Sequence, residues 1–197
     1  MPTKTNNFQW HRIGIYAGGF DPVHLGHITF ALQAAETARL DKVIFLPERR
    51  PLGGEILAHF GHRAAMIARA IRPYPRFNLL ELPDMYFSAA KTLPKLQKIF
   101  AGDELVFMKS SADYGDLTLR PEILDLGRDF ELAIGFAPGV RPPESLKNSQ
   151  IHLIEEIWPP LNPEIIRRAM LAGVSAEGLL KSVRAYAAEN WLYASLA

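Results

Sequence analysis

Two kinds of hydrophobic pattern alternate along the chain. Short apolar runs rich in β-branched residues are typical of buried strands, and longer stretches with apolar residues three or four positions apart are typical of helices. The short runs predict strands at 13–16, 43–47, 77–82, 105–108, 130–136 and 151–154. The longer stretches predict helices at 26–40, 62–71, 92–100, from 121 onward, 163–172 and 176–189. Strands that alternate with helices in this way build an α/β fold with a doubly wound, Rossmann-like parallel sheet.

Three further features of the sequence concern the first helix, a loop and the C-terminal helices. The apolar residues of the first predicted helix fall on one face, namely Ile28, Leu32, Ala35 and Ala38. Proline and polar residues dominate 137–150, which is typical of a surface loop. The two final helices are expected to pair, so we predict a single domain over 1–197 with a C-terminal helical part at 158–197.

Composition narrows the possible functions. The chain has 197 residues, of which 48% are hydrophobic, with a net charge of +1 and no cysteine. The charge balance argues against a nucleic-acid partner, and the absence of cysteine excludes disulfides, thiolate catalysis and Cys-ligated metals. No run approaches the roughly 18 apolar residues that a membrane span needs, and the first residues lack a signal core. We therefore expect no membrane partner and a cytoplasmic location.

The stretch AGGFDPVHLGH joins the first predicted strand to the first helix. Ligands of open parallel sheets bind at such junctions. Gly18 and Gly19 allow a sharp turn close to a ligand, and the helix that begins near Gly26 offers N–H groups and a positive dipole end to phosphate. His24 and His27, three positions apart, can both point toward the same phosphate. The stretch holds no evident nucleophile, so it is suited to stabilising charge at phosphorus while a substrate makes the attack.

Other interpretations of these and nearby residues remain. His24 and His27 can be surface histidines or a metal site, although no third ligand stands at zinc spacing. Asp21, before Pro22, is expected to be a turn residue. His59 and His62 repeat the spacing without a preceding strand, and we expect them to be helix-start and surface groups.

The tryptophans are expected to have structural roles. Trp158 can stack on a base or pack against the core, and packing is the simpler interpretation. Trp191 is expected to be a core residue of the last helix.

GGFDPVHLGH resembles the signature of the nucleotidylyltransferase superfamily, G-x-F-D-P-x-H-x-G-H between a strand and a helix. That resemblance implies transfer of a nucleotidyl group from a nucleoside triphosphate, with Mg²⁺, to a phosphate-bearing acceptor, and release of pyrophosphate. It implies catalytic roles for His24 and His27 and nucleotide contacts at four further positions, namely Gly18, Gly19, Phe20 and Gly26. No protein ligand to the metal is predicted.

Nearly the whole chain is similar to bacterial nicotinate-nucleotide adenylyltransferases. The segments LDKVIFLP, HRAAMIARAI, FNLLEL, KTLPKLQKIF, ELVFM and VRAYAAENWLY follow one another as in that family. The resemblance implies ATP as the donor and nicotinate mononucleotide as the acceptor, in NAD biosynthesis. Phosphopantetheine adenylyltransferases share the first motif but normally carry Thr at the position of His24.

Several positions near the substrate depart from that family's pattern. The basic Pro-Pro-His-Lys segment is PERRPLGGE here, in which Arg49 or Arg50 can supply the charge. The family's Ser-Tyr-Thr corresponds to 87–89, and of its Gly-Ala-Asp only Asp113 matches, after a shift of one residue. The Trp expected to stack on the pyridine ring is absent from DLTLRPE.

The C-terminal signature Ser-Ser-Thr-x-x-Arg reads LNPEIIRR in this chain. Asn162 can cap the helix and Pro163 suits its first turn. Arg167 is retained for the triphosphate, but Glu164 adds a negative charge where phosphate is expected. The alternative function is therefore a nucleotide-binding protein of this fold without transferase activity. The acceptor, the choice between ATP and CTP, and the oligomeric state stay open.

Overall fold

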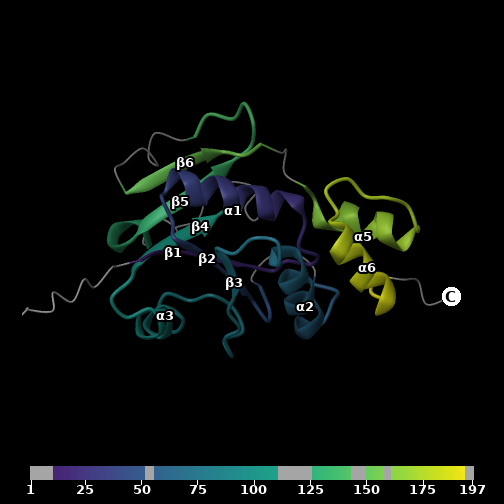
Figure 1. The fold of residues 1–197 in the computed structure, drawn as a ribbon, viewed down its shortest axis with the longest axis horizontal. Helices are drawn as coiled ribbons and strands as arrows, with labels where there is room; N and C mark the ends of the chain where they lie inside the picture. The colour runs from purple at the N-terminus through teal and green to yellow at the C-terminus, as the bar shows by residue number, and fades with distance from the viewer. Residues whose placement is uncertain (1–10, 52–55, 111–125, 143–149, 158–160, 194–197) are drawn as a thin grey trace, which may run out of the picture.

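A computed structural model describes residues 11–51, 56–110, 126–142, 150–157 and 161–193. It contains a six-stranded sheet in the order β3-β2-β1-β4-β5-β6, and every neighbouring pair is parallel (Figure 1). Strand order reverses direction between β1 and β4, as in a doubly wound sheet. The predicted fold class is therefore confirmed.

The helices and strands lie close to the predicted ranges. The strands are β1 (Arg12–Gly18), β2 (Lys42–Pro47), β3 (Phe77–Leu79), β4 (Glu104–Lys109), β5 (Glu131–Phe136) and β6 (Ile151–Glu155). The helices are α1 (Leu25–Thr37), α2 (Phe60–Ile71), α3 (Leu93–Ile99), α5 (Pro163–Leu171) and α6 (Lys181–Glu189). Most of the helix expected from 121 onward lies outside the described residues, and 126–129 are helical. None of the helices in the described ranges has the length and apolar character that a membrane crossing requires.

Three predicted details are wrong. β3 ends at Leu79 rather than at 82: the N–H of Leu80 still bonds to the carbonyl of Phe45 at 3.0 Å, and the chain then leaves the sheet with Glu81 exposed. The final helix begins at Lys181 rather than at 176, since Gly178 adopts a φ of +75° that interrupts any helix. Leu32 is 39% exposed, whereas the other predicted face residues of α1 are buried.

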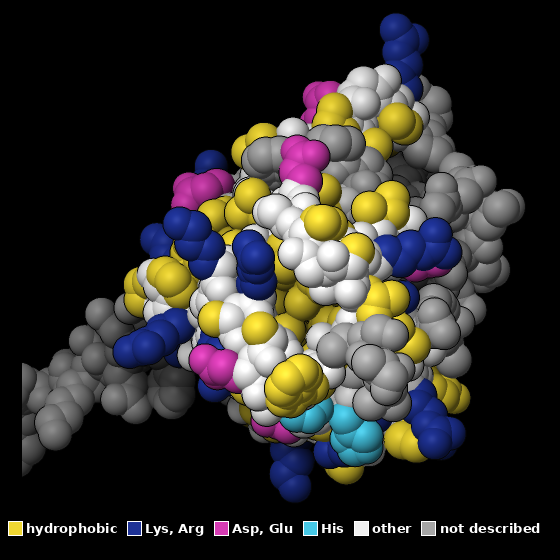
Figure 2. Space-filling model, turned by 90° about the vertical axis from the view of Figure 1, so that its right-hand side faces the viewer, with side chains coloured by type: hydrophobic (Ala, Val, Ile, Leu, Met, Phe, Trp, Pro, Cys, Tyr) yellow, Lys and Arg dark blue, Asp and Glu magenta, His cyan; other side chains and the backbone are white. Residues whose placement is uncertain are grey.

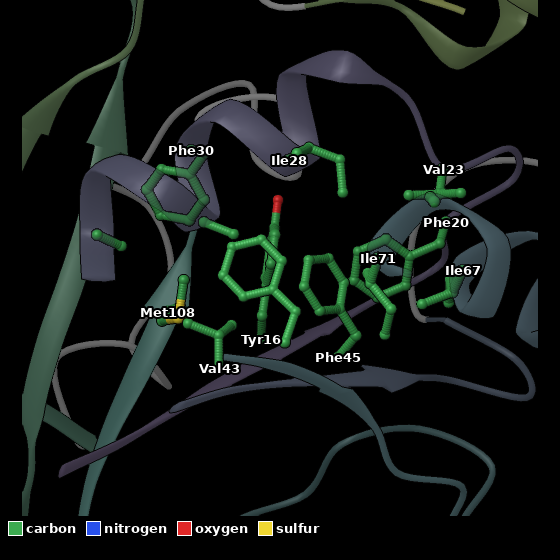
Figure 3. Packing of buried hydrophobic residues seen from close by; sticks show 14 of the residues in the cluster. Tyr16, Phe20, Val23, Ile28, Phe30, Val43, Phe45, Ile67, Ile71 and Met108 are labelled. Atoms are coloured by element: carbon green, nitrogen blue, oxygen red, sulfur yellow. The ribbon is translucent and has the colours of Figure 1, made fainter. Parts of the chain in front are cut away.

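Hydrophobic layers cover both faces of the sheet. On one face α1 and α2 pack over aromatic residues of β1 and β2, and Figure 3 shows the rings of Tyr16, Phe20 and Phe45 side by side there. The ring centroids of Tyr16 and Phe30 are 5.3 Å apart in an edge-to-face contact. On the other face α3 contributes Leu96 to a second cluster. These layers fix the direction of β1 and so the place where it ends.

The two ends of the strands differ in chemistry. At the amino end, Arg12 binds Glu104 at 2.6 Å and Glu131 at 2.7 Å, and Glu131 also lies 2.6 Å from His152. The Arg12 guanidinium holds the pKa of Glu131 below its usual value. At the carboxyl end stand the loops from the strands into the helices, together with α5 and α6, seen at the right of Figure 1. The ion pairs therefore serve stability, and the candidate chemistry lies at the opposite end.

Candidate active site

The predicted phosphate motif occupies the loop between β1 and α1. β1 pairs with β2 on one side and with β4 on the other, so the loop leaves the sheet at the switch point of strand order. His24 is the N-cap of α1, with extended backbone, and His27 lies in the first turn. The motif thus has the strand-to-helix position that the sequence predicts.

The two histidines form a buried, stacked pair. The exposed fraction is 0% for His24 and 3% for His27, and their ring centroids lie 3.7 Å apart with an interplanar angle of 32°. The backbone N–H of His24 donates to Nδ1 of His27 at 3.1 Å. Because that nitrogen accepts, the neutral ring of His27 carries its proton on Nε2.

Burial keeps both rings neutral. It lowers the pKa of His24 to about 3. It also holds the pKa of His27 well below the ordinary value, and the neighbouring His24 lowers it further. A cationic imidazole is therefore unfavourable here until an anion arrives to compensate its charge.

His24 is the unsatisfied member of the pair. Among the described residues neither of its ring nitrogens has a hydrogen-bond partner. Such a group costs free energy unless something binds it, so these two nitrogens are candidates for contact with a ligand. The α1 terminus beside it has no acidic residue in its first turn, so its dipole is available to an anion.

Gly26 allows this placement of His24. A Cβ at Gly26 would lie 3.1 Å from Nδ1 and 3.2 Å from Cε1 of His24, closer than ordinary contacts allow. The glycine between the histidines thus lets the first imidazole lie against α1 without the shift of a few tenths of an ångström that a Cβ would require. Whether its backbone also contacts a nucleotide stays a prediction.

The other predicted nucleotide-binding residues of the loop have visible structural roles. Gly18 closes β1 opposite Pro47, and its carbonyl accepts from the N–H of Glu48 at 2.9 Å. A Cβ at Gly19 would meet Ile56 at 3.1 Å. Phe20 has a φ of +51° and turns its ring into the core, 5.0 Å from the ring of His27. Phe20 therefore packs edge-to-face against the ring of His27. Its predicted contact with a nucleotide stays a prediction.

A buried arginine that the sequence analysis did not single out holds this loop. Arg63 of α2 is 0% exposed, and its guanidinium donates to the carbonyls of Gly19, Ala58 and Arg49. Burial lowers its pKa from the ordinary value. The signal was present in the sequence, because Arg63, Ile67 and Ala70 share one buried helical face on which a charge is unusual.

Asp21 and Arg167 meet behind the histidines. The carboxylate of Asp21 is buried and accepts from the N–H groups of Leu57 at 2.7 Å and Ala58 at 3.3 Å. Nη1 of Arg167 donates to the carbonyl of Asp21 at 2.8 Å. The structure therefore brings Arg167 to the motif, where its Nη1 also lies 3.9 Å from Oδ2 of Asp21. Its predicted contact with phosphate stays a prediction.

Arg49 and Arg50 follow β2 at the same end of the sheet. The guanidinium carbon of Arg49 lies 4.2 Å from the ring centroid of Phe60, and its Nε donates to the carbonyl of Leu82 at 3.3 Å. The backbone N–H of Arg50 donates to Met85 at 2.6 Å. Both side chains are exposed, so either charge is accessible to an anion.

The chain carries a second His-x-Gly-His, at 59–62, in a different setting. His59 is the N-cap of α2 but is exposed, and no strand directly precedes it. His62 lies 2.9 Å, through its Nδ1, from the hydroxyl of Tyr186. His59 is therefore at a helix start and exposed, as predicted, whereas His62 is half-buried rather than a surface group.

The C-terminal helical part lies over the beginning of α1. The carbonyl of Gly178 accepts from the N–H of Leu25 at 2.8 Å, and Leu161 packs within 3.6 Å of a Cβ position at Gly26. Asn162 caps α5 as predicted, with its Oδ1 accepting from Glu164 at 2.8 Å. Figure 2 shows this end of the molecule, where hydrophobic side chains lie among many Lys and Arg side chains and fewer acidic ones.

The prediction of a core position for Trp191 is wrong. α6 ends before it, Trp191 takes a left-handed φ of +54°, and its side chain is 83% exposed. Leu192 and Tyr193 pack against the core instead. Asp113 and Trp158 lie outside the described residues.

A second polar pair is buried at the carboxyl end of the sheet. The Ser110 hydroxyl, after β4, donates to the Glu156 carboxylate, after β6, at 2.9 Å. Gly135 on β5 leaves the space, since a Cβ there would lie 2.1 Å from Glu156 Oε1. In the described part of the chain, no group of three or more His, Asp or Glu residues is placed to hold a metal ion.

Two sequence relatives cover almost the whole chain. One from Dictyoglomus thermophilum is 30% identical over 194 residues, which span 92% of this chain and 99% of the relative. Another from Solibacter usitatus is 28% identical over 187 residues, with the same shares of both chains. Both carry the name probable nicotinate-nucleotide adenylyltransferase.

The comparison of structures agrees on the fold. The Plasmodium falciparum nicotinic acid mononucleotide adenylyltransferase complexed with NaAD aligns with a TM-score of 0.73 at 16% identity, over 93% of this chain and 97% of that one. A family model described as cytidylyltransferase-like matches residues 15–112, a segment that includes the histidine pair, Gly26 and the buried Arg63. With that match, and with the similarity to the Dictyoglomus protein extending over both chains, this chain belongs to the cytidylyltransferase-like family of nucleotidyltransferases.

Proposed function

We propose that this protein transfers the adenylyl group of ATP to the phosphate of nicotinate mononucleotide and releases pyrophosphate. The observation that carries the proposal is the buried pair of His24 and His27 at the N-terminus of α1, with the nitrogens of His24 unsatisfied. The names of the two full-length relatives support the choice of donor and acceptor.

The reaction needs an electrostatic site more than a protein nucleophile. A phosphate oxygen of the acceptor attacks the α-phosphorus of ATP in line, the new P–O bond forms, and the bond to the bridging oxygen of pyrophosphate breaks. Charge grows on that bridging oxygen and on the non-bridging oxygens of the transferred group. His24 and the Nε2–H of His27 donate hydrogen bonds to these oxygens, and the α1 dipole adds to the stabilisation.

The neutral state of the two rings suits this role. Two neutral imidazoles repel an incoming triphosphate less than carboxylates would, and they offer N–H donors without an existing counter-ion. As the polyphosphate enters, its charge compensates the burial that lowers the pKa of His24 and His27. The site thus interacts more strongly with the charge that develops on the bridging oxygen as its bond to the α-phosphorus breaks than with the same oxygen in bound ATP.

The described residues offer no protein cage for Mg²⁺, since no group of three or more candidate ligands comes together among them. Mg²⁺ commonly binds through substrate phosphates and keeps several waters, so an ion that arrives bound to ATP does not need such a cage. When bound, the ion neutralises phosphate charge. Arg49 and Arg50, exposed at the same end of the sheet, are the residues we propose for the outer phosphates.

The alternative is a nucleotide-binding protein without transfer activity, and the start of α5 favours it. Asn162 already caps that helix, and Glu164 in its first turn brings a negative charge. Arg168 pairs with Glu164 at 2.5 Å and offsets part of that charge. The main proposal remains compatible with this charge if the triphosphate is held chiefly at the N-terminus of α1 and by Arg49 and Arg50, because it then does not contact the N-terminus of α5.

Pyrophosphate release tests the proposal. ATP or CTP with Mg²⁺ is offered with nicotinate mononucleotide, nicotinamide mononucleotide or phosphopantetheine, to the wild type and to His24→Ala/His27→Ala. The matched control is His59→Ala/His62→Ala, which removes the same residues from the second His-x-Gly-His. We expect release with ATP and nicotinate mononucleotide, a loss of at least about 100-fold in the first double variant, and little change in the control.

Each other result has a definite meaning. Release with a different acceptor or with CTP replaces the proposed substrate. Binding of ATP with no release from any acceptor supports the alternative. Equal activity in the two double variants removes the histidine pair from the mechanism.

A further inference from the structure

Asp21 connects the motif loop to two distant parts of the chain. It stands three positions before His24, and its carboxylate is buried. Besides the N–H groups of Leu57 and Ala58, this carboxylate accepts a hydrogen bond from the hydroxyl of Tyr193. One side chain of the loop is thereby tied to the segment before α2 and to the residues after α6.

Tyr193 reaches Asp21 through an unusual turn. At the end of α6 the N–H of Leu192 bonds to the carbonyl of Ala187 at 2.9 Å, and both Trp191 and Tyr193 have left-handed backbones, with φ values of +54° and +59°. Residues other than glycine adopt this conformation at a cost in free energy, and they keep it where surrounding contacts require it. The contacts of Tyr193 are its packing on the core and its hydroxyl bond to Asp21.

The hydroxyl is a permanent donor. Burial raises the pKa of Tyr193 far above its ordinary value, and the charge of Asp21 raises it further. The phenol therefore stays protonated and keeps its O–H available for this hydrogen bond. Arg167 acts on the same residue from α5, with its Nη1 2.8 Å from the carbonyl of Asp21 and 3.9 Å from Oδ2.

These contacts converge on the loop that carries the first histidine. Arg63 holds the carbonyl of Gly19, Arg167 holds the carbonyl of Asp21, and Tyr193 holds its carboxylate. Electrostatic catalysis depends on donors fixed in place before the reaction, and misplacement by about 1 Å can cost a factor of about 100. Supports of this kind belong to the reaction even though they lie behind the reacting groups.

We propose that Tyr193 is a positioning residue for the transferase reaction, because its hydrogen bond to Asp21 fixes the loop that presents His24 at the N-terminus of α1. This inference rests on the proposed function. It assigns to the segment after α6 a role in the rate of the chemical step, in addition to its packing on the core.

Tyr193→Phe tests the inference, since it removes one hydroxyl and keeps the ring. Tyr186→Phe is the matched control, because the Tyr186 hydroxyl also joins the C-terminal part to α2, 2.9 Å from His62, and within the described ranges it has no hydrogen bond to the motif loop. We expect Tyr193→Phe to lower kcat about tenfold with KM for ATP changed less than twofold. Tyr186→Phe keeps kcat within twofold of the wild type.

Hydrogen exchange gives a readout that needs no activity. The N–H groups of Leu57 and Ala58 bind the Asp21 carboxylate, so their exchange should quicken in Tyr193→Phe and stay unchanged in Tyr186→Phe. Equal kcat in both variants, or an equal loss in both, overturns the inference. If the wild type releases no pyrophosphate with any acceptor, the proposed function fails. The exchange comparison then decides separately whether the hydroxyl holds the loop.

Discussion

Replacing Gly26 by alanine should separate stability from activity. The new Cβ would lie 3.1 Å and 3.2 Å from atoms of the His24 imidazole, so the ring must move by a few tenths of an ångström. Alanine is the better helix former, by up to about 1 kcal/mol in a helix interior and by less at this second position, which offsets part of the strain. We therefore expect the free energy of unfolding to change by less than about 1 kcal/mol. We expect kcat to fall about tenfold, equivalent to about 1.4 kcal/mol of transition-state stabilisation.

The chain supplies its own control for this substitution. Gly61 is also the second residue of a helix that follows a histidine N-cap, and a Cβ there meets nothing within 4 Å. Both variants are measured by pyrophosphate release under saturating substrates and by urea denaturation. Gly61→Ala should keep the wild-type kcat. If Gly26→Ala also keeps it within twofold, the imidazole does not need the position seen in the structure, and the argument from crowding is wrong.

Three further predictions concern stability. Because burial lowers the pKa of His24 to about 3 and that of His27 well below its ordinary value, the unfolded chain takes up protons first as pH falls. The contribution of the neutral histidines to stability is therefore complete above about pH 6.5, and below it the free energy of unfolding falls by up to about 1.4 kcal/mol per pH unit for each histidine. Urea denaturation at about pH 7.5 and pH 5 measures this fall, which should be smaller in His24→Ala/His27→Ala than in the wild type. Gly135→Ala places a Cβ 2.1 Å from a Glu156 oxygen and should destabilise the fold by about 3 kcal/mol, as thermal denaturation can measure; an unchanged melting temperature contradicts this. Arg63→Met leaves buried carbonyls without donors and should cost about 3 kcal/mol in urea denaturation, whereas a cost below about 1 kcal/mol would show that water replaces the guanidinium.

The four inner strands, β1, β2, β4 and β5, could be predicted because each is buried over most of its length. Runs such as VIFLP are apolar throughout, and only a central strand of a parallel sheet tolerates that composition. The start of α6 could not be found in the same way. Apolar spacing continues through 176–180, but Gly178 turns the chain to meet Leu25, and that contact is invisible in a local pattern. Trp191 was misplaced for a related reason, because helical spacing does not show where a helix ends.

In the candidate site, too, features set by local sequence could be predicted and features set by tertiary contacts could not. Its histidines could be predicted, since a strand, a glycine turn and a helix start are all local features. The helical pattern marks Arg63 as an unusual charge on a buried face, but its partners could not be predicted, because backbone carbonyls carry no side-chain signature. Arg167 was recognised by resemblance, yet its contact with the Asp21 carbonyl follows only from the tertiary structure. Sequence reasoning therefore finds the groups proposed for the chemistry more readily than the groups that hold them.

The supports of the motif loop are also separated from it by long stretches of chain. Arg167 is 146 positions and Tyr193 172 positions from Asp21. At a synthesis rate of about 5–20 residues per second, roughly 10–35 s pass between the emergence of Asp21 and that of Tyr193. During that interval β1, β2 and β4 can already pair, since every residue they need has been made. The contacts of Arg167 and Tyr193 with Asp21 can therefore form only after all residues of β1, β2 and β4 have been made.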